Sequence, residues 1–206
     1  TVAARVSTHL CAVEISRLPA ARFLVAKLYL PHTPASRRID GWLERLGRRL
    51  SYVWFLLLAV IVCNVVLRYV FNQGRIELEE LQWHLYSVGF LLGMSYAYQA
   101  DAHIRVDVLH ENFSDPTKAW IELYGILLLL LPFVALILIF SVRFVESSWA
   151  LGEVSSSPGG LPLRWLIKAV LPLGFGLLLL SALSRLLRLW YFLFLQPREE
   201  LAHADE

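Results

Sequence analysis

Four long runs of apolar residues most strongly constrain what this chain can fold into. They cover residues 51–71, 81–98, 121–142 and 166–185. A helix needs about 20 apolar residues to cross a hydrocarbon core of about 30 Å, and backbone exposed to lipid must satisfy its own hydrogen bonds. The runs therefore predict four transmembrane helices. The second is the weakest prediction, because it is the shortest and contains Gln82, His84 and Ser87.

The segment between the third and fourth runs is a turn rich in serine, proline and glycine at 155–160. Such a turn marks a point where the chain leaves the bilayer and re-enters it. Trp149, Trp165 and Lys168 flank the turn, as is typical of membrane-interface anchors. Lys168 and Arg185 are expected to snorkel to opposite faces of the membrane from the fourth helix.

Basic residues are distributed unevenly along the chain and predict its orientation. They cluster before the first run and after the last one, at Arg37, Arg38, Arg45, Arg48, Arg49, Arg185, Arg188 and Arg198. The loop between the first two runs instead contains Glu77, Glu79 and Glu80 beside a single arginine. By the positive-inside rule both termini are predicted to be cytoplasmic. The loop at 101–118 is then cytoplasmic, and the loop at 153–164 faces outward.

The remaining segments complete the predicted organisation. Apolar residues recur at helical spacing over 37–50, which predicts a short amphipathic helix at the cytoplasmic surface. Residues 1–36 lack the pattern of a signal peptide and are interpreted as an N-terminal extension. Residues 51–195 form the four-helix domain, and 196–206 a polar tail. The predicted fold is an all-α integral membrane protein with four transmembrane helices, an N-terminal amphipathic interfacial helix and cytoplasmic termini.

The chain has little that points to chemistry of its own. No carboxylate lies deep in any run, which argues against a lone pump or exchanger. Cys11 and Cys63 are too few for a cysteine metal site, and His84 is the only histidine in a run, which argues against a bis-histidine haem. A net charge of +2 does not indicate nucleic-acid binding, and no catalytic or phosphate-binding motif is present. The sequence predicts no enzyme, no cofactor and no metal.

Several polar residues have more than one interpretation. Glu77, Glu80 and His84 share a helical face, which suits a metal site, a Glu80–His84 contact that stabilises the helix, or a partner interface. Asp101 with the nearby His103 and Asp107 suits a divalent ion, or a segment that grips lipid or a neighbour. Arg68 either snorkels or pairs with one of the glutamates at 77, 79 and 80.

Small residues are spaced to allow close helix packing. Gly89 and Gly93, with Ala97 on the same face, form a small-xxx-small ridge. Gly125 with Pro132, and Gly174 with Ser181, are each seven residues apart. Such ridges serve either contacts within this chain or a groove for another subunit.

Five motifs in order resemble one family, the DctQ-like small membrane subunits of tripartite ATP-independent periplasmic (TRAP) transporters. They are NVVLRYVF at 64–71, ELEE with Trp83-His84, SVGFLLGMSY at 87–96, HIRVD at 103–107, and Gly152-Glu153 through Pro158-Gly159-Gly160, Trp165 and Lys168 to Gly174. The resemblance covers about residues 39–195.

This resemblance implies a scaffold role in the bacterial inner membrane. Such subunits are partners of a large multi-span permease that holds the substrate and sodium sites, and a periplasmic solute-binding protein delivers a solute, typically one with a carboxylate. The residues expected at partner interfaces are Arg68, Glu79, Trp83, His84, Gly89, Gly93, Arg105, Asp107, Glu153, Pro158, Gly159, Gly160, Arg164 and Lys168. Two alternatives stay open, a stand-alone four-helix redox or metal protein and a membrane assembly or sensor protein.

Overall fold

The computed structural model describes residues 30–31, 33–101 and 113–195, and this part of the chain is helical throughout its regular structure. The predicted polar tail at 196–206, and most of the predicted extension at 1–36, lie outside the described residues. The elements are α3 (Pro34–Leu50), α4 (Tyr52–Tyr69), α5 (Ile76–Gln99), α7 (Asp115–Gly125), the π-helical segment η1 (Ile126–Leu130), α8 (Leu131–Ala150) and α9 (Arg164–Phe194).

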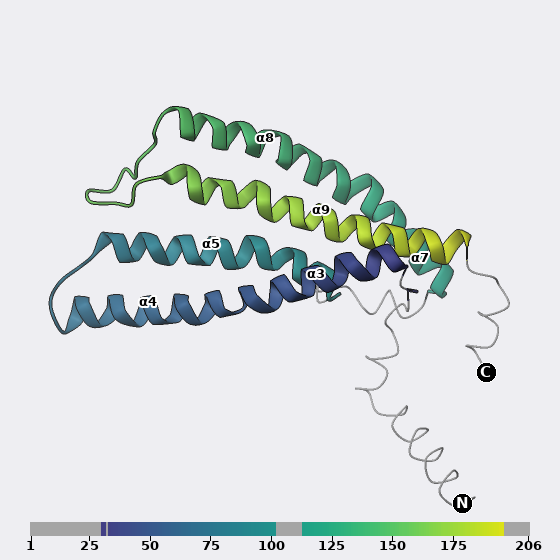
Figure 1. The fold of residues 1–206 in the computed structure, drawn as a ribbon, viewed down its shortest axis with the longest axis horizontal. Helices are drawn as coiled ribbons and strands as arrows, with labels where there is room; N and C mark the ends of the chain where they lie inside the picture. The colour runs from purple at the N-terminus through teal and green to yellow at the C-terminus, as the bar shows by residue number, and fades with distance from the viewer. Residues whose placement is uncertain (1–29, 32, 102–112, 196–206) are drawn as a thin grey trace, which may run out of the picture.

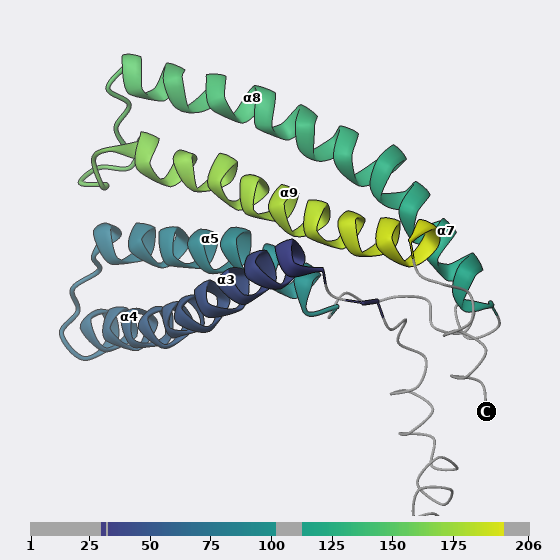
Figure 2. The same cartoon turned by 45° about the vertical axis from the view of Figure 1, so that its right-hand side comes forward.

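The long helices form an open layer. α5 packs against α4 on one side and against α9 on the other, and α8 packs against α9, so that α4 and α8 lie at the two edges (Figures 1 and 2). Many large apolar side chains are consequently exposed, among them Leu58, Phe90, Leu128, Leu129, Phe133 and Phe140. Apolar surface of this extent marks contact with lipid or with a protein partner.

α3 starts earlier than the amphipathic helix expected at 37–50, and it runs on into α4. Pro34 occupies the first turn, and the Thr33 hydroxyl accepts a hydrogen bond from the Ser36 amide at 3.2 Å, a typical start for a helix. Ser51 keeps right-handed helical dihedral angles between α3 and α4. The two helices therefore form a nearly continuous rod over Pro34–Tyr69. Placement of α3 at the membrane surface stays a prediction.

α7, η1 and α8 form a second continuous rod, Pro116–Ala150. The π-helical segment η1 ends two residues before Pro132, which lies in the first turn of α8. A proline has no amide hydrogen to donate, and its ring crowds the carbonyl four residues earlier. The wider π-helical turn accommodates that crowding while the rod continues.

Three helical stretches of the described chain are long and apolar enough to cross a membrane. They are Pro34–Tyr69, Pro116–Ala150 and Arg164–Phe194, which include the first, third and fourth predicted spans. α5, which holds the second predicted span at 81–98, is not among them. Gln82, His84 and its tyrosines make α5 less apolar than the other long helices, so the prediction of four spans is supported for three.

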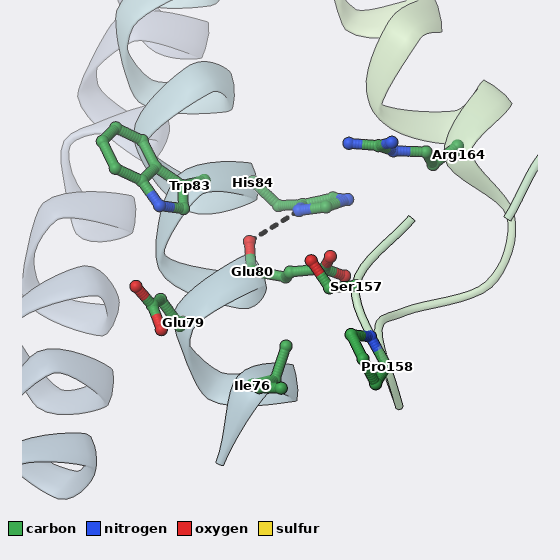
Figure 3. A pocket seen from close by; sticks show the side chains of 8 residues that line it. All are labelled: Ile76, Glu79, Glu80, Trp83, His84, Ser157, Pro158 and Arg164. Carbon is green, nitrogen blue, oxygen red and sulfur yellow. Dashed lines mark hydrogen bonds between the residues drawn. The ribbon is translucent and has the colours of Figure 1, made fainter. Parts of the chain in front are cut away.

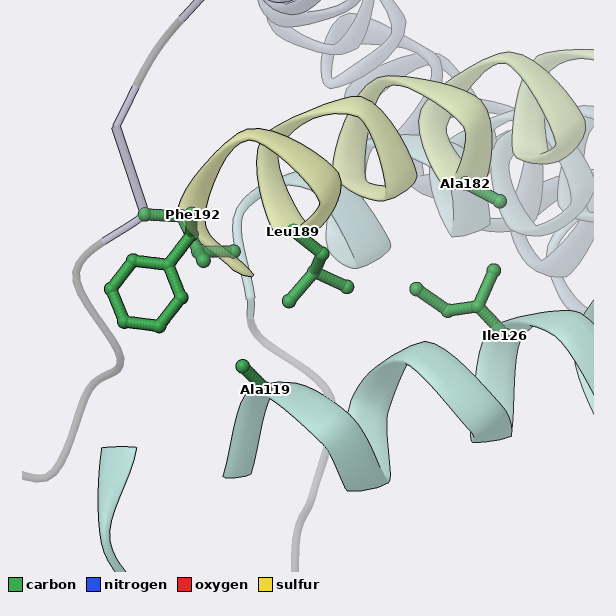
Figure 4. Packing of buried hydrophobic residues seen from close by; sticks show 6 residues of the cluster. Ala119, Ile126, Ala182, Leu189 and Phe192 are labelled. Atoms are coloured by element: carbon green, nitrogen blue, oxygen red, sulfur yellow. The ribbon is translucent and has the colours of Figure 1, made fainter. Parts of the chain in front are cut away.

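α9 carries most of the core. Ala182, Leu189 and Phe192 on α9 face Ala119 and Ile126 on the α7–η1 rod (Figure 4). A second cluster joins Phe175 and Leu178 of α9 to Val134 of α8. These contacts hold the α7–η1–α8 rod along one side of α9.

A network of buried charges joins the end of α9 to three other segments. Arg185 lies 3.1 Å from Asp101, which follows α5, and it also pairs with Glu122 of α7. Asp40 of α3 accepts a hydrogen bond from Ser184 at 2.7 Å and lies 3.7 Å from Arg188. The predicted snorkelling of Arg185 is wrong, because its side chain is only 5% exposed and points into the protein. Paired carboxylates make that inward position favourable.

Candidate functional site

At the opposite end of the layer, the loop between α8 and α9 is bound to the first turns of α5. The Glu80 carboxylate accepts a hydrogen bond from the Ser155 hydroxyl and another, at 2.6 Å, from the Leu161 amide. The hydroxyl contact, followed by the amide contact, holds the pKa of Glu80 below its usual value. Glu80 therefore fastens the loop to α5 as a charged acceptor.

A second carboxylate ties the loop to its own two helices. Glu153 accepts hydrogen bonds from the Lys168 ammonium of α9 and, at 2.7 Å, from the Ser148 hydroxyl of α8. Lys168 also lies over the Phe144 ring, 4.2 Å from the ring centre. The predicted snorkelling of Lys168 is therefore incomplete, since its side chain is 17% exposed and is engaged by Glu153.

Glycines allow the loop to lie close against Glu80. Gly159 has a φ of 77°, a conformation that side chains with a Cβ rarely adopt. At Gly160 a Cβ would lie 2.5 Å from the Ser155 hydroxyl oxygen and 2.7 Å from the Glu80 carboxylate. The loop backbone can approach α5 this closely only because position 160 has no side chain.

Between this loop and α5 lies a pocket of about 490 Å³. It is lined by Ile76, Glu79, Glu80, Trp83, His84, Ser157, Pro158 and Arg164. Figure 3 shows the His84 ring and the Arg164 side chain directed toward each other from α5 and α9, with Glu79 and Trp83 on the other side of α5. The pocket thus combines a cation, two carboxylates, an imidazole and an exposed indole.

The tautomer of His84 follows from a contact within its own helix. Its Nδ1 lies 2.6 Å from the Glu80 carbonyl oxygen, and because a carbonyl only accepts, Nδ1 donates. In the neutral ring Nε2 is then an acceptor on the pocket side. A contact between Glu80 and His84, one of the three interpretations of these residues, therefore exists, but it uses the Glu80 backbone instead of its carboxylate, which the loop occupies.

The arrangement suits recognition of another molecule. Within the described ranges no three His, Cys, Asp or Glu side chains come together as a metal site would require. Arg164 offers the planar set of donors that binds a carboxylate in two contacts. Trp83, 67% exposed, adds an apolar surface with one hydrogen-bond donor. Such a pocket can hold a polar side chain or loop of a partner.

The structure brings many of the predicted interface residues together. Glu79, Trp83, His84, Pro158 and Arg164 line the pocket, and Gly159, Gly160, Glu153 and Lys168 belong to the loop or its attachments. The others lie elsewhere.

Three predicted residues lie on the helices away from this pocket, and two lie outside the described residues. Arg68 is exposed on α4 and forms no ion pair with the glutamates at 77, 79 and 80, all of which are described. At Gly89 a Cβ would lie 3.2 Å from the Trp54 ring of α4, whereas at Gly93 it would meet nothing within 4 Å. Gly89 thus serves a contact within this chain. Arg105 and Asp107 are outside the described residues, as is His103.

Two polar features of the structure were not predicted from the sequence. Ser155 carries no sequence signal beyond that of a turn residue, yet it is a donor to Glu80, 75 residues away. The buried network of Asp40, Arg185 and Arg188 was also missed. One signal for it is present in the sequence, since two arginines three residues apart in an otherwise apolar helix require partners.

We predict that Glu153→Gln loosens the loop at neutral pH. In the native protein, the Lys168 and Ser148 hydrogen bonds lower the pKa of Glu153 below its usual 4.5. A carboxylate whose pKa is lowered by its attachment stabilises that attachment fully when the pH is above the usual pKa. The stabilisation is lost as the pH falls through the lowered pKa. A spin label at exposed position 156, in a background without the native cysteines, should therefore stay immobile at neutral pH and become mobile only below 4.5.

The Glu153→Gln variant should already show a more mobile label than the native chain at neutral pH, because the Glu80 contacts with Ser155 and Leu161 are then the remaining attachment. Glu146→Gln is the matched control, because Glu146 is an exposed glutamate of α8. An immobile label in the Glu153→Gln variant at neutral pH would show that the carboxylate does not hold the loop.

Comparison with known proteins gives one match. The family model described as "Tripartite ATP-independent periplasmic transporters, DctQ component" matches residues 57–191, which is well over half of the chain and covers α5, α7, η1 and α8 entirely with most of α4 and α9. No curated protein and no solved structure matches the chain.

Proposed function

Because the chain belongs to the DctQ family, the membrane component of tripartite ATP-independent periplasmic transporters, we propose that it braces the large multi-span permease of such a transporter. As a DctQ component it is a transport protein of the inner membrane and not an enzyme. We also propose that a periplasmic solute-binding protein delivers the solute, that an ion gradient drives uptake, and that the solute carries a carboxylate.

The open layer of helices is the observation that carries the scaffold role. A closed four-helix bundle hides its apolar side chains, whereas this layer exposes them on α4, α5 and α8. Trp83, Tyr86 and Phe90 form an exposed aromatic stripe on α5 that ends at the pocket with Arg164. Aromatic residues and arginine dominate the energetics of protein interfaces. The proposed interface with the permease or the binding protein is therefore centred on this pocket.

The proposed topology has four spans and cytoplasmic termini. α5 has 24 residues, which corresponds to about 36 Å of helix and is enough to cross the hydrocarbon core. It also runs alongside α4 and α9 over most of their length, and α3 begins at the same end of the layer at which α9 ends (Figure 1). With the arginine-rich segments of α3 at that end, the positive-inside rule makes it cytoplasmic.

Copurification from native membranes tests this function. The full chain is captured in mild detergent, and the proteins that accompany it are identified by mass spectrometry. A large multi-span permease in equal amount is the expected result. Recovery of the chain alone, or with bound haem or metal, would overturn the scaffold proposal in favour of a redox or metal protein.

Gly93→Leu is predicted to weaken this copurification without destabilising the chain. A Cβ at position 93 would meet nothing within 4 Å in the part of the chain that the structure describes, so a leucine side chain there projects from α5 and blocks the close approach of a partner helix. The measurement compares the amount of permease recovered with the unfolding midpoint of the isolated chain. Gly93→Ala is the control, because one methyl group should be tolerated. Full recovery of the permease with the leucine variant would remove Gly93 from the proposed interface.

A further inference from the structure

α3 presents an arginine-lined face away from the other helices. Ser36, Asp40, Leu43 and Gly47 are its buried positions, and they repeat at three- and four-residue intervals along one side. The exposed positions include all five of its arginines, which are Arg37, Arg38, Arg45, Arg48 and Arg49. The arginines therefore point outward as a group.

The rotation of α3 about its axis is fixed by its buried side. The Asp40 carboxylate accepts the Ser184 hydroxyl at 2.7 Å. At Gly47 a Cβ would lie 2.5 Å from the Tyr96 ring, so the helix backbone lies directly against that ring. Because these two contacts are a turn or more apart, α3 cannot turn its arginines inward.

The charge of this face is only partly neutralised within the described part of the chain. Arg48 pairs with Glu44 at 2.8 Å, and both side chains remain more than half exposed. Arg45 donates its Nε hydrogen to the Gly41 carbonyl, an interaction that leaves its charge uncompensated. Among the described residues, neither Arg45 nor Arg49 forms an ion pair. Trp42, 47% exposed, precedes these two by three and seven residues and so lies on their side of the helix.

The length of α4 places these arginines relative to a bilayer. α4 has 18 residues, or about 27 Å of helix, close to the thickness of the hydrocarbon core. If α4 spans that core, the last turns of α3, with Arg45, Arg48 and Arg49, lie at the level of the headgroups. An exposed tryptophan beside them is typical of the same level.

We propose that Arg45, Arg48 and Arg49, with Trp42, form a binding site for anionic phospholipid headgroups of the cytoplasmic leaflet. This inference rests on the proposed topology. Guanidinium groups bind phosphate oxygens in paired contacts, and clustered basic residues next to a transmembrane helix are attracted to anionic lipid. The adjacent indole favours a lipid surface over an acidic protein surface, because it needs an apolar neighbour.

Lipid retention by the full chain tests the proposal. The purified protein is reconstituted into nanodiscs with equal amounts of phosphatidylglycerol and phosphatidylcholine, and the lipids that remain bound are counted by native mass spectrometry. The native chain should retain phosphatidylglycerol preferentially. Arg45→Gln with Arg49→Gln should reduce that preference by about fivefold for each arginine removed. The corresponding double lysine variant should keep most of it.

The matched control is Arg75→Gln with Arg143→Gln, which removes the same charge from exposed positions elsewhere. An unchanged preference in the Arg45 and Arg49 variant, or an equal loss in the control, would overturn the proposal. Loss of permease copurification with unchanged lipid retention would assign the face to an acidic protein partner instead. The nanodisc result does not depend on the permease, so the lipid site can fail while the scaffold function stands.

Discussion

Gly174→Ala should destabilise the protein by about 1–3 kcal/mol, the cost of forcing extra volume into a tight contact. At this position a Cβ would lie 2.8 Å from the backbone carbonyl oxygen of Leu91. Backbone cannot rotate aside as a side chain does, so α5 and α9 would have to separate. Their separation would also weaken the hydrogen bond from the Ser181 hydroxyl to the Ser95 carbonyl, which is 2.9 Å long and lies two turns further along.

Gly176→Ala is the matched control for this prediction. Gly176 lies two residues away in the same helix, and a Cβ there meets nothing within 4 Å. Replacing an unhindered helical glycine with alanine stabilises a helix by about 0.5–1 kcal/mol. The free energy of unfolding should therefore rise in the Gly176→Ala variant and fall in the Gly174→Ala variant. Unfolding of each purified variant in mixed detergent micelles, followed by circular dichroism, measures the difference. Two stabilising substitutions would show that α5 and α9 do not approach closely at Gly174.

This contact shows what the sequence can and cannot predict about packing. The spacing of Gly174 and Ser181 identified one face of the fourth run, and that face does pack closely against α5. The spacing did not distinguish it from Gly93, which has an equally good motif although a Cβ there would meet nothing within 4 Å among the described residues. A ridge of small residues indicates that another helix packs closely against it. It does not indicate whether that helix belongs to the same chain or to a partner.

The helix boundaries were predictable where turn chemistry is strong. The Pro-Gly-Gly turn and the flanking tryptophans predicted the position of the α8–α9 loop. In the structure the rings of Trp149 and Trp165 pack edge to face, with their centres 4.4 Å apart. The predicted helix begins at residue 37, whereas α3 begins at Pro34, because the amphipathic pattern starts only after the cap at Thr33. Continuity through Ser51 was not predictable either, because it depends on how α3 packs against α5 and α9.

The polar contacts were the least predictable part of the site. Glu79, Trp83, His84 and Arg164 were identified as interface residues, and they line one pocket. The partners of Glu80, by contrast, are a hydroxyl and an amide more than 70 residues away. Such pairs depend on tertiary arrangement, and neither helical periodicity nor local spacing contains them. The same reason explains why the inward position of Arg185 was missed.

Arg185→Met should cause the largest loss of stability of any substitution considered, about 3–5 kcal/mol. Removing one partner of a buried ion pair leaves the opposite charge without compensation, and here two carboxylates, Asp101 and Glu122, face the same guanidinium. Methionine nearly preserves the volume of the side chain, so the effect reports charge more than packing. Because Arg185 connects α9 with α7 and with the end of α5, all three should loosen together.

A second variant separates charge from misfolding. Adding Glu122→Gln to Arg185→Met removes one of the two uncompensated carboxylates, so it should recover part of the lost stability although it changes another buried residue. Arg143→Met is the control, because Arg143 is exposed on α8 and its loss should change the unfolding free energy by less than about 0.5 kcal/mol. Unfolding in mixed micelles again provides the measurement. Equal effects of Arg185→Met and Arg143→Met, or no recovery in the double variant, would show that the buried charges do not stabilise the junction of α9 with its neighbours.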